Sequence, residues 1–293
     1  MREEWITSRK NPLLVQIRRL VSSRGARRSA GMFLGDGVKL LEEALKWGAP
    51  LETVVYSEGL DGPELPPEVR TVRVPEDVMA SVSPAQTPQG VLSVCAMTPQ
   101  SVPAKLEGAV YMVLDGVQDP GNVGTILRTA DCAGMDGLLL SEQCADIFSP
   151  KVLRATMGSI FRMPVEVTAD LPGRLYALRE QGYSVLSSQL DGTPFYQRRG
   201  VGERYVLVVG NEGNGVSHQV QQLATHRLRL PMRGGAESLN AAVAAGILMY
   251  QSQSWGNKVD RGRLFPRMEF TFWYGIFHVY FSLLSLAGQM RQV

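Results

Sequence analysis

The sequence predicts an α/β protein in which a larger domain, built on a mainly parallel β-sheet with helices on both faces, follows a smaller α/β domain. The first observation is that short apolar runs typical of buried strands alternate with helical segments after residue 107. The second is a polar stretch with two prolines, residues 99–107, between two apolar parts of the chain. The third is size, because 293 residues with 44% hydrophobic content suffice for two domains with a core each.

Four segments are expected along the chain: a domain over residues 1–98, a linker over 99–107, a domain over 108–256 and a hydrophobic tail of unknown role over 257–293. In the first domain, the apolar spacing in FLGDGVKLLEEALKWGAP indicates an amphipathic helix that Gly48 ends, and the predicted strands are TVVY, TVRV and VLSVCAM. In the second domain, the predicted strands are VYMVLD, GLLL, PVEV, YSVLS, YVLVVG and HRLRLP.

The first 30 residues carry eight basic side chains against Glu3 and Glu4, whereas the whole chain has a formal charge of only +2. The overall charge therefore does not indicate a nucleic-acid partner. A locally basic arm is nevertheless suited to lie along a phosphate backbone. A solvated surface helix explains the same charges equally well, so both interpretations stay open.

Compartment and membrane signals are sparse. The three cysteines, Cys95, Cys132 and Cys144, are too few and too irregularly spaced for a disulfide framework or a zinc site, which favours a reducing cytoplasm and no metal. The charged first residues argue against a signal peptide. Residues 270–288 carry no formal charge and are nearly long enough to cross a bilayer. Their aromatic and polar composition favours a docked helix, an oligomer contact or an appended tail over a membrane span.

Because ligands gather where parallel strands end, the loops after the predicted strands are the places to search for a site. The loop GVQDPGNVGTILRTADCAG follows VYMVLD, and in it Pro120 and Gly121 break the chain. Asn122 is expected to cap the next helix, with Arg128 in its second turn. A helix start beside a guanidinium can hold a phosphate. Turn geometry and a solvated arginine are the alternative explanation.

The loop NEGNGVS follows YVLVVG and places Glu212 among Gly210, Gly213 and Gly215, where a backbone has to approach a ligand or adopt a positive φ. It is not a G-x-G-x-x-G fingerprint, so an oxidoreductase that binds a dinucleotide is poorly supported.

The third unusual stretch is LPMRGGAESLNAAVAAGILMY. Pro231 is expected to end a strand, and Ser238 is expected to cap a helix whose start carries Asn240. The alanines after Asn240 let another backbone come close, either the sheet or a second subunit.

The order and spacing of these loops carry more information than any one of them. N-x-G-x-x-x-R at 122–128, G-N-E-G-x-G at 210–215, and L-P-M with S-L-N within 230–240 resemble the three motifs of SpoU (TrmH-like) RNA methyltransferases of the SPOUT superfamily. Residues 148–165 resemble the stretch between the first two motifs. The segment GMFLGDGVKLLEEALKWG resembles the substrate-binding domain, similar to kink-turn-binding ribosomal proteins, that is often fused ahead of this fold.

The resemblance implies a trefoil-knotted catalytic domain with a parallel sheet, an exception to the rule that chains do not thread their loops. It implies transfer of a methyl group from S-adenosyl-L-methionine to a ribose 2′-hydroxyl. The implied cofactor-binding residues are Ser187, Gly210, Leu230, Met232 and Leu239. The implied catalytic residues are Asn122, Arg128, Glu212, Ser238 and Asn240.

The family mechanism gives the residue that matches Arg128 the role of proton acceptor, but a guanidinium stays protonated in proteins. We expect Arg128 instead to grip the phosphate and stabilise alkoxide charge, while substrate phosphate or water assists the proton transfer. Asn122 is expected to position the ribose or Arg128, Glu212 to orient loop groups, and Ser238 with Asn240 to complete a polar wall.

The resemblance also implies a homodimer, and the fused first domain favours ribosomal RNA as the substrate. The alternatives are a transfer RNA substrate and an inactive RNA-binding protein of the same fold.

Overall fold

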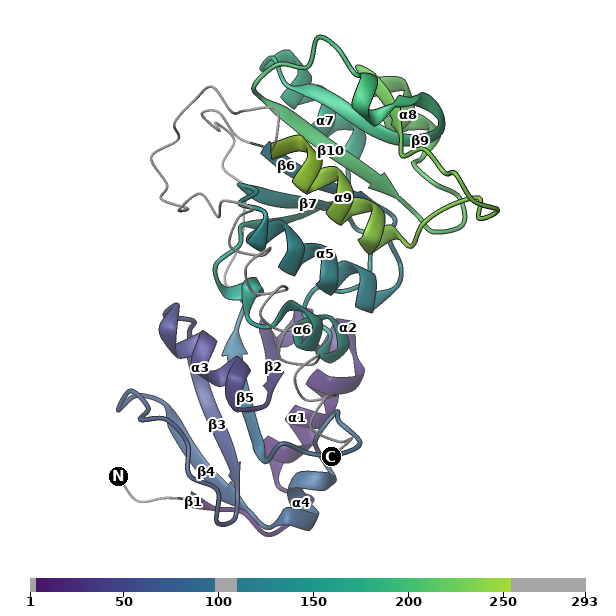
Figure 1. Ribbon diagram of the computed structural model, residues 1–293. Coiled ribbons are helices and arrows are strands. Elements are labelled where there is room, and N and C mark those ends of the chain that lie inside the picture. The colour runs from purple at the N-terminus through teal and green to yellow at the C-terminus, as the bar shows by residue number, and fades with distance from the viewer. Residues whose placement is uncertain (1–3, 98–109, 254–293) are drawn as a thin grey trace, which may run out of the picture. The chain divides into compact units, whose positions relative to one another are not determined.

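The computed structural model describes residues 4–97 and 110–253, which form two β-sheets with helices packed on them (Figure 1). The strand order is β1-β4-β3-β5-β2 in the first sheet and β11-β9-β10-β6-β7-β8 in the second. Every strand pair of the second sheet is parallel. The predicted parallel sheet, preceded by a smaller α/β part, is therefore confirmed.

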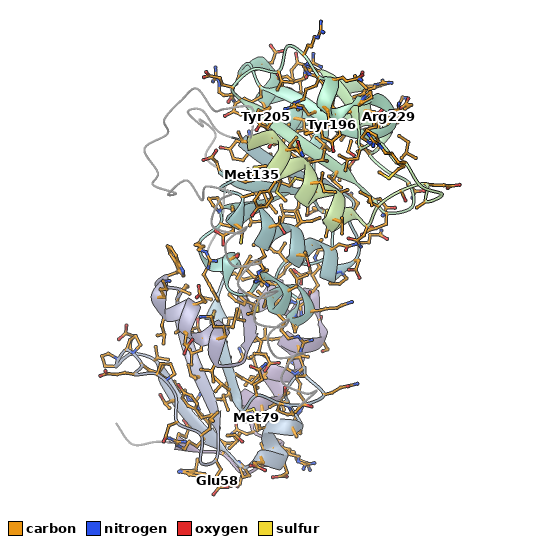
Figure 2. The ribbon with its side chains drawn as sticks, viewed as in Figure 1. Glu58, Met79, Met135, Tyr196, Tyr205 and Arg229 are labelled. Carbon is orange, nitrogen blue, oxygen red and sulfur yellow. The ribbon has the colours of Figure 1, made fainter. Side chains whose placement is uncertain are left out.

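The first sheet and its helices come from residues 4–96. Their elements are β1 (Glu4–Trp5), α1 (Pro12–Ser22), α2 (Arg24–Ala30), β2 (Met32–Asp36), α3 (Val38–Lys46), β3 (Leu51–Ser57), β4 (Arg70–Val74), α4 (Glu76–Ala80) and β5 (Val91–Ala96). Leu14 and Ile17 of α1 and Met79 of α4 pack with the strands in a core of this sheet's own (Figure 2). All three predicted strands of this part are present.

The segment expected to form one amphipathic helix divides into a strand and a helix. Residues Met32–Asp36 pair antiparallel with β5, and only Val38–Lys46 is helical. Gly35 allows a close approach of the two strands, because a Cβ atom there would lie 2.4 Å from the Ser93 Oγ on the paired strand. Gly48 follows the helix with φ +65°, as expected of the residue that ends it.

The second sheet and its helices come from residues 110–253. Their elements are β6 (Val110–Asp115), α5 (Pro120–Cys132), β7 (Gly137–Ser141), α6 (Pro150–Thr156), a 3-10 turn (Ser159–Phe161), β8 (Val165–Thr168), α7 (Leu171–Glu180), β9 (Ser184–Pro194), a second 3-10 turn (Phe195–Gln197), β10 (Tyr205–Gly210), α8 (His218–Leu223), β11 (His226–Arg229) and α9 (Ala241–Gln253). The six predicted strands of this part are all present.

Alternate side chains of the central strands of this sheet face two separate cores. Met112 and Leu114 of β6 lie in a core with α5, α6 and α9, whereas Tyr111 and Val113 lie in a core with α7 and α8. The period of two follows from the strand geometry, since successive side chains point to opposite faces. The expectation of helices on both faces is confirmed.

Side chains of the first sheet also pack against the second. Phe33, Leu40 and Cys95 belong to the same hydrophobic core as β6 and α5. Arg27 of α2 is only 4% exposed, and its Nε donates a hydrogen bond of 2.8 Å to Asp146 Oδ2 in the loop after β7. Neither interpretation of the basic arm describes Arg27, because its charge is buried in an ion pair.

Within the described residues, no helix combines the length and hydropathy that a membrane span needs. The predicted linker over 99–107 and the tail over 257–293 lie outside the described residues. The three cysteines are unpaired, with Cys95 and Cys144 buried and Cys132 exposed.

Candidate functional site

The carboxyl ends of β6 and β10 lie side by side at one edge of the second sheet. The two strands pair in parallel register up to Asp115 and Gly210. The loops that follow them, 116–119 and 211–217, therefore start next to each other, as the sequence predicts.

Asn211 ties these two loops together. Its Nδ2 donates a hydrogen bond of 2.9 Å to the carbonyl oxygen of Gly116, and its Oδ1 accepts one of 2.9 Å from the backbone N–H of Gly213. The loop folds so tightly on itself that a Cβ atom at Gly210 would lie 2.1 Å from the carbonyl carbon of Gly215. Gly210 is therefore needed for the shape of the loop. Asn211 is not among the residues predicted from the sequence, although it lies within the second motif.

Helix α5 starts at Pro120, and its N-cap is Asp119, whose Oδ1 accepts a hydrogen bond of 2.8 Å from the backbone N–H of Asn122. The expectation that Asn122 caps this helix is therefore wrong. Because Asp119 supplies the cap, the side-chain amide of Asn122 is available for other contacts. The earlier start also places Arg128 in the third turn rather than the second.

Three of the predicted catalytic residues form one hydrogen-bonded chain. Asn122 Nδ2 donates to Glu212 Oε1 at 2.9 Å, and Asn240 Nδ2 donates to Asn122 Oδ1 at 2.9 Å. These residues come from α5, from the loop after β10 and from the start of α9. The three motifs therefore meet through side chains that lie 90 and 118 positions apart in the sequence.

Glu212 is held as a carboxylate in this chain. Burial by itself raises its pKa, but the hydrogen bond from Asn122 and those from backbone N–H groups outweigh it, so its pKa lies below the ordinary value. One of these backbone donors is Gln118, whose N–H reaches Glu212 Oε2 at 3.4 Å. An ionised Glu212 accepts hydrogen bonds only, which fixes the orientation of the Asn122 amide.

The N-cap of α9 is Asn240 and not Ser238. Asn240 Oδ1 accepts hydrogen bonds from the backbone N–H groups of Ala242 at 2.9 Å and Val243 at 3.2 Å. Since α9 begins at Ala241, Ser238 lies too far ahead of it to cap it, and the predicted cap is wrong. Ser238 is exposed in the loop between β11 and α9.

Arg128 is exposed on α5 and lies outside the hydrogen-bonded chain. Within the part of the protein that the structure describes, no side chain or carbonyl group forms a hydrogen bond or an ion pair with its guanidinium. The structure therefore brings together Asn122, Glu212 and Asn240. It leaves the donors of Arg128 and the hydroxyl of Ser238 facing solvent.

The five residues predicted to bind the cofactor lie on the strands and loops around this edge. Ser187 is buried on β9, and its Oγ accepts a hydrogen bond of 3.0 Å from Gln189 Nε2. Met232 and Leu239, by contrast, expose 36% and 39% of their surface in the loop between β11 and α9. Exposed apolar side chains beside backbone groups suit a flat, polar-edged ring such as adenine. Among the described residues there is no cluster of metal-ligand side chains.

Comparison with known proteins gives matches over both sheets. Residues 109–250 match the SpoU rRNA Methylase family, and residues 11–93 match the MRM3-like substrate binding domain. The 23S rRNA (guanosine(2553)-2'-O)-methyltransferase RlmP of Bacillus subtilis is 37% identical over 246 residues, which cover 84% of this chain and 97% of the relative. The 23S rRNA (uridine(2479)-2'-O)-methyltransferase of Streptomyces viridochromogenes is 31% identical over 266 residues.

Among solved structures, the AdoMet-bound rRNA methyltransferase from Sinorhizobium meliloti is 30% identical with a TM-score of 0.75, covering 86% of this chain and 98% of that one. The SpoU methyltransferase AviRb from Streptomyces viridochromogenes, in complex with AdoMet, is 27% identical with a TM-score of 0.74 and covers 85% and 99%. Fold and site thus define an α/β protein with a ligand site at the carboxyl edge of a parallel sheet. The chain belongs to the SpoU rRNA Methylase family.

Proposed function

We propose that this protein is an S-adenosyl-L-methionine-dependent RNA methyltransferase that methylates a ribose 2′-hydroxyl in ribosomal RNA. The observation that carries the proposal is the hydrogen-bonded chain of Glu212, Asn122 and Asn240, with the exposed Arg128 on the same helix as Asn122. The relatives whose names specify rRNA 2′-O-methyltransferases, and the matched substrate-binding domain over residues 11–93, support ribosomal RNA as the substrate.

The residues at the sheet edge fit the cofactor. S-adenosyl-L-methionine supplies a methyl group that is already activated for transfer. Met232 and Leu239 are proposed to pack against its adenine, because both expose apolar surface in one loop. The backbones of Ser187, Gly210 and Leu230 are proposed to bind its polar groups. The two solved structures named above are complexes with AdoMet, which supports this assignment.

The residues act mainly by positioning and by charge. Arg128 is proposed to bind the phosphate next to the target ribose and to stabilise the negative charge that develops on the 2′-oxygen. The proton leaves to that phosphate or to water, since Arg128 stays protonated. The amide of Asn122, held between Glu212 and Asn240, orients the ribose. Ser238 offers a further hydroxyl at the same edge.

We propose that the protein acts as a homodimer through α9. This helix, AAVAAGILMYQSQ, has no charged residue, and Val243 and Tyr250 expose 51% and 54% of their surface.

Replacing Tyr250 by glutamate is expected to convert the dimer to monomer, because a carboxylate is costly to bury in an apolar interface. Sedimentation velocity measures this, with the exposed Tyr176→Glu on α7 as the matched control. A wild-type protein that sediments as a monomer contradicts the proposal.

Three further assignments belong to the proposal. A trefoil knot is supported by the sheet order, in which β9 lies between β10 and the later strand β11. After β11 the chain returns, and α9 packs on α5 and β10. The free cysteines support a cytoplasmic location. The proposed domain limits are 1–98, 108–256 and 257–293, with a linker over 99–107.

Two measurements test the function. Isothermal titration is expected to show binding of S-adenosyl-L-methionine and none of NAD. Mapping of ribose methylation in cells with and without the gene is expected to show one 2′-O-methyl group in ribosomal RNA that depends on the gene. If the methylation of ribosomal RNA is unchanged and that of transfer RNA is altered, the substrate is transfer RNA. Failure to bind the methyl donor overturns the enzymatic function.

A further inference from the structure

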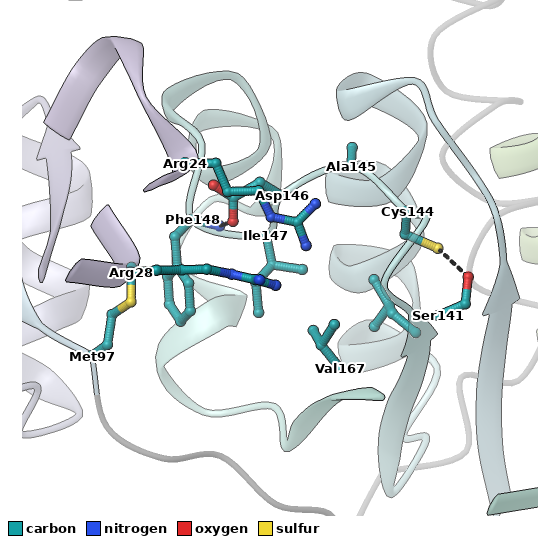
Figure 3. A pocket seen from close by; sticks show the side chains of 11 residues that line it. Arg24, Arg28, Met97, Ser141, Cys144, Ala145, Asp146, Ile147, Phe148 and Val167 are labelled. Atoms are coloured by element: carbon teal, nitrogen blue, oxygen red, sulfur yellow. Dashed lines mark hydrogen bonds between the residues drawn. The ribbon is translucent and has the colours of Figure 1, made fainter. Parts of the chain in front are cut away.

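A pocket opens between α2 and the carboxyl ends of β7 and β8 (Figure 3), and none of the proposed cofactor residues lines it. It has a volume of about 170 Å³. Its lining combines two arginines of α2, Arg24 and Arg28, with apolar side chains from the loop after β7, from β8 and from Met97. The methylation chemistry proposed above uses none of these residues.

The charge at the rim of the pocket is positive and not fully compensated. The Nε of Arg24 is buried and has no hydrogen-bond partner among the described residues. Arg28 Nη2 lies 3.7 Å from Glu142 Oε1, and both side chains are about half exposed, so this pair is weak and easily exchanged for another anion. Asp146 does not neutralise these two arginines, because it is already paired with Arg27. A phosphate group suits such a pair of guanidinium groups.

The interior of the pocket is apolar and partly aromatic. The ring of Phe148 stacks on Phe33, with centroids 4.8 Å apart, which holds Phe148 in place at the pocket wall. Val167 is 38% exposed on β8, an edge strand of the sheet on which only Val165 is buried. A flat base fits against such a wall, and unpaired RNA bases are commonly bound by aromatic and apolar side chains next to arginines.

The pocket wall is hydrogen-bonded to the loop that leads into the catalytic helix. Ser141 Oγ accepts a hydrogen bond of 2.9 Å from the N–H of Gly116, and the N–H of Ala145 donates one of 3.0 Å to the carbonyl oxygen of Val117. Residues 116–119 connect β6 to α5, which carries Asn122. A ligand in the pocket therefore lies on the β7 side of the same sheet edge as the site.

We propose that this pocket binds one unpaired nucleotide of the RNA substrate, distinct from the nucleotide that is methylated. The base lies against Phe148 and Val167, and its phosphate is held by Arg24 and Arg28. This inference rests on the proposed function and deepens it, because it names a second point at which the enzyme recognises its RNA.

Replacing Val167 by tryptophan fills the pocket without a change in charge. We expect this variant to bind ribosomal RNA about ten- to hundred-fold more weakly, in the range measured for the loss of one stacked base. Its KM for RNA rises, while its affinity for S-adenosyl-L-methionine and its kcat at saturating RNA stay unchanged. Unchanged RNA affinity in a folded Val167→Trp protein, judged by circular dichroism, overturns the proposal.

A second variant keeps the test decisive if Val167→Trp does not fold. Arg28 has a half-exposed side chain, so Arg28→Ala is expected to fold and to bind RNA more weakly than Arg9→Ala does. Arg9 is the matched control, because it loses the same charge from an exposed pair with Asp77 in the same part of the chain. Equal effects of the two variants show general attraction of RNA and contradict a defined phosphate site.

Cross-linking locates the nucleotide directly. Ribosomal RNA containing 4-thiouridine, irradiated with the full-length protein, is expected to attach to the peptide that carries Phe148, and Val167→Trp is expected to remove this cross-link. Competition by uridine monophosphate alone at equal affinity shows a free nucleotide site and overturns the RNA assignment. If the wild-type protein transfers no methyl group at all, the proposed function is wrong. If it transfers methyl groups normally but neither Val167→Trp nor Arg28→Ala weakens RNA binding, only this inference is wrong.

Discussion

Replacing Arg128 by alanine is expected to lower kcat by about 10²- to 10³-fold, the loss typical of removing one group that stabilises developing negative charge. The structure supports a direct role because Arg128 is exposed on α5 and is not engaged by the described residues around it. Affinity for S-adenosyl-L-methionine is expected to stay the same, because the proposed cofactor residues lie on other loops. Single-turnover methyl transfer to ribosomal RNA measures the effect.

The variant Arg128→Lys tests whether catalysis needs only a positive charge at this position or the planar shape of the guanidinium. If a point charge is sufficient, the lysine variant keeps partial activity, whereas a loss equal to that of Arg128→Ala shows that the planar guanidinium is required. The control is Arg179→Ala on α7, an exposed arginine on a helix that packs on the opposite face of the sheet. Full activity of Arg128→Ala contradicts the proposed mechanism.

Replacing Arg27 by alanine is expected to lower the free energy of unfolding by about 3–5 kcal/mol, the range for breaking a buried ion pair. The side chains of Arg27 and Asp146 are only 5% and 15% exposed, so the variant leaves a buried carboxylate without its partner. The buried carbonyl group of Leu20 and the partly buried one of Val21 also lose the hydrogen bonds that Arg27 donates to them. Urea denaturation measures the change.

Arg9→Ala is the control for stability, because Arg9 and Asp77 are 57% and 65% exposed and such a pair contributes at most about 1 kcal/mol. A further variant separates the lost interaction from the charge left behind. Arg27→Met combined with Asp146→Asn is expected to recover part of the lost stability, since no unpaired charge remains. A loss of less than 1 kcal/mol in Arg27→Ala shows that the pair does not stabilise the protein.

The convergence of the three loops follows from the sequence pattern. VYMVLD and YVLVVG are almost wholly apolar, as strands buried on both faces are, and parallel strands bring the loops after them to one edge. The structure confirms this for Asn122 and Glu212, which meet at 2.9 Å. The predicted cap positions are wrong because each loop contains two polar candidates within three positions of each other. Asp119 competes with Asn122, and Asn240 competes with Ser238.

The buried ion pair of Arg27 cannot be predicted from a local sequence pattern. In the sequence it is one of several arginines in a basic segment, and the charge of that segment suggests solvent or RNA. In the structure its carboxylate partner lies 119 residues further along the chain. The same holds for the pocket of Arg24 and Arg28, whose walls come from α2, Met97 after β5, the end of β7 with the loop that follows it, and β8.

The sequence by itself determined the parallel sheet, the edge at which the three motif loops meet and the residues of those motifs, because hydrophobic periodicity and loop composition act over a few neighbouring residues. Only the tertiary structure decided which polar groups pair with each other. The chain Glu212–Asn122–Asn240, the buried ion pair of Arg27 and the strand at Met32–Asp36 each depend on a partner distant in the sequence. Such partners are selected by packing and by the cost of leaving a buried polar group unpaired, and both arise only when the chain is folded.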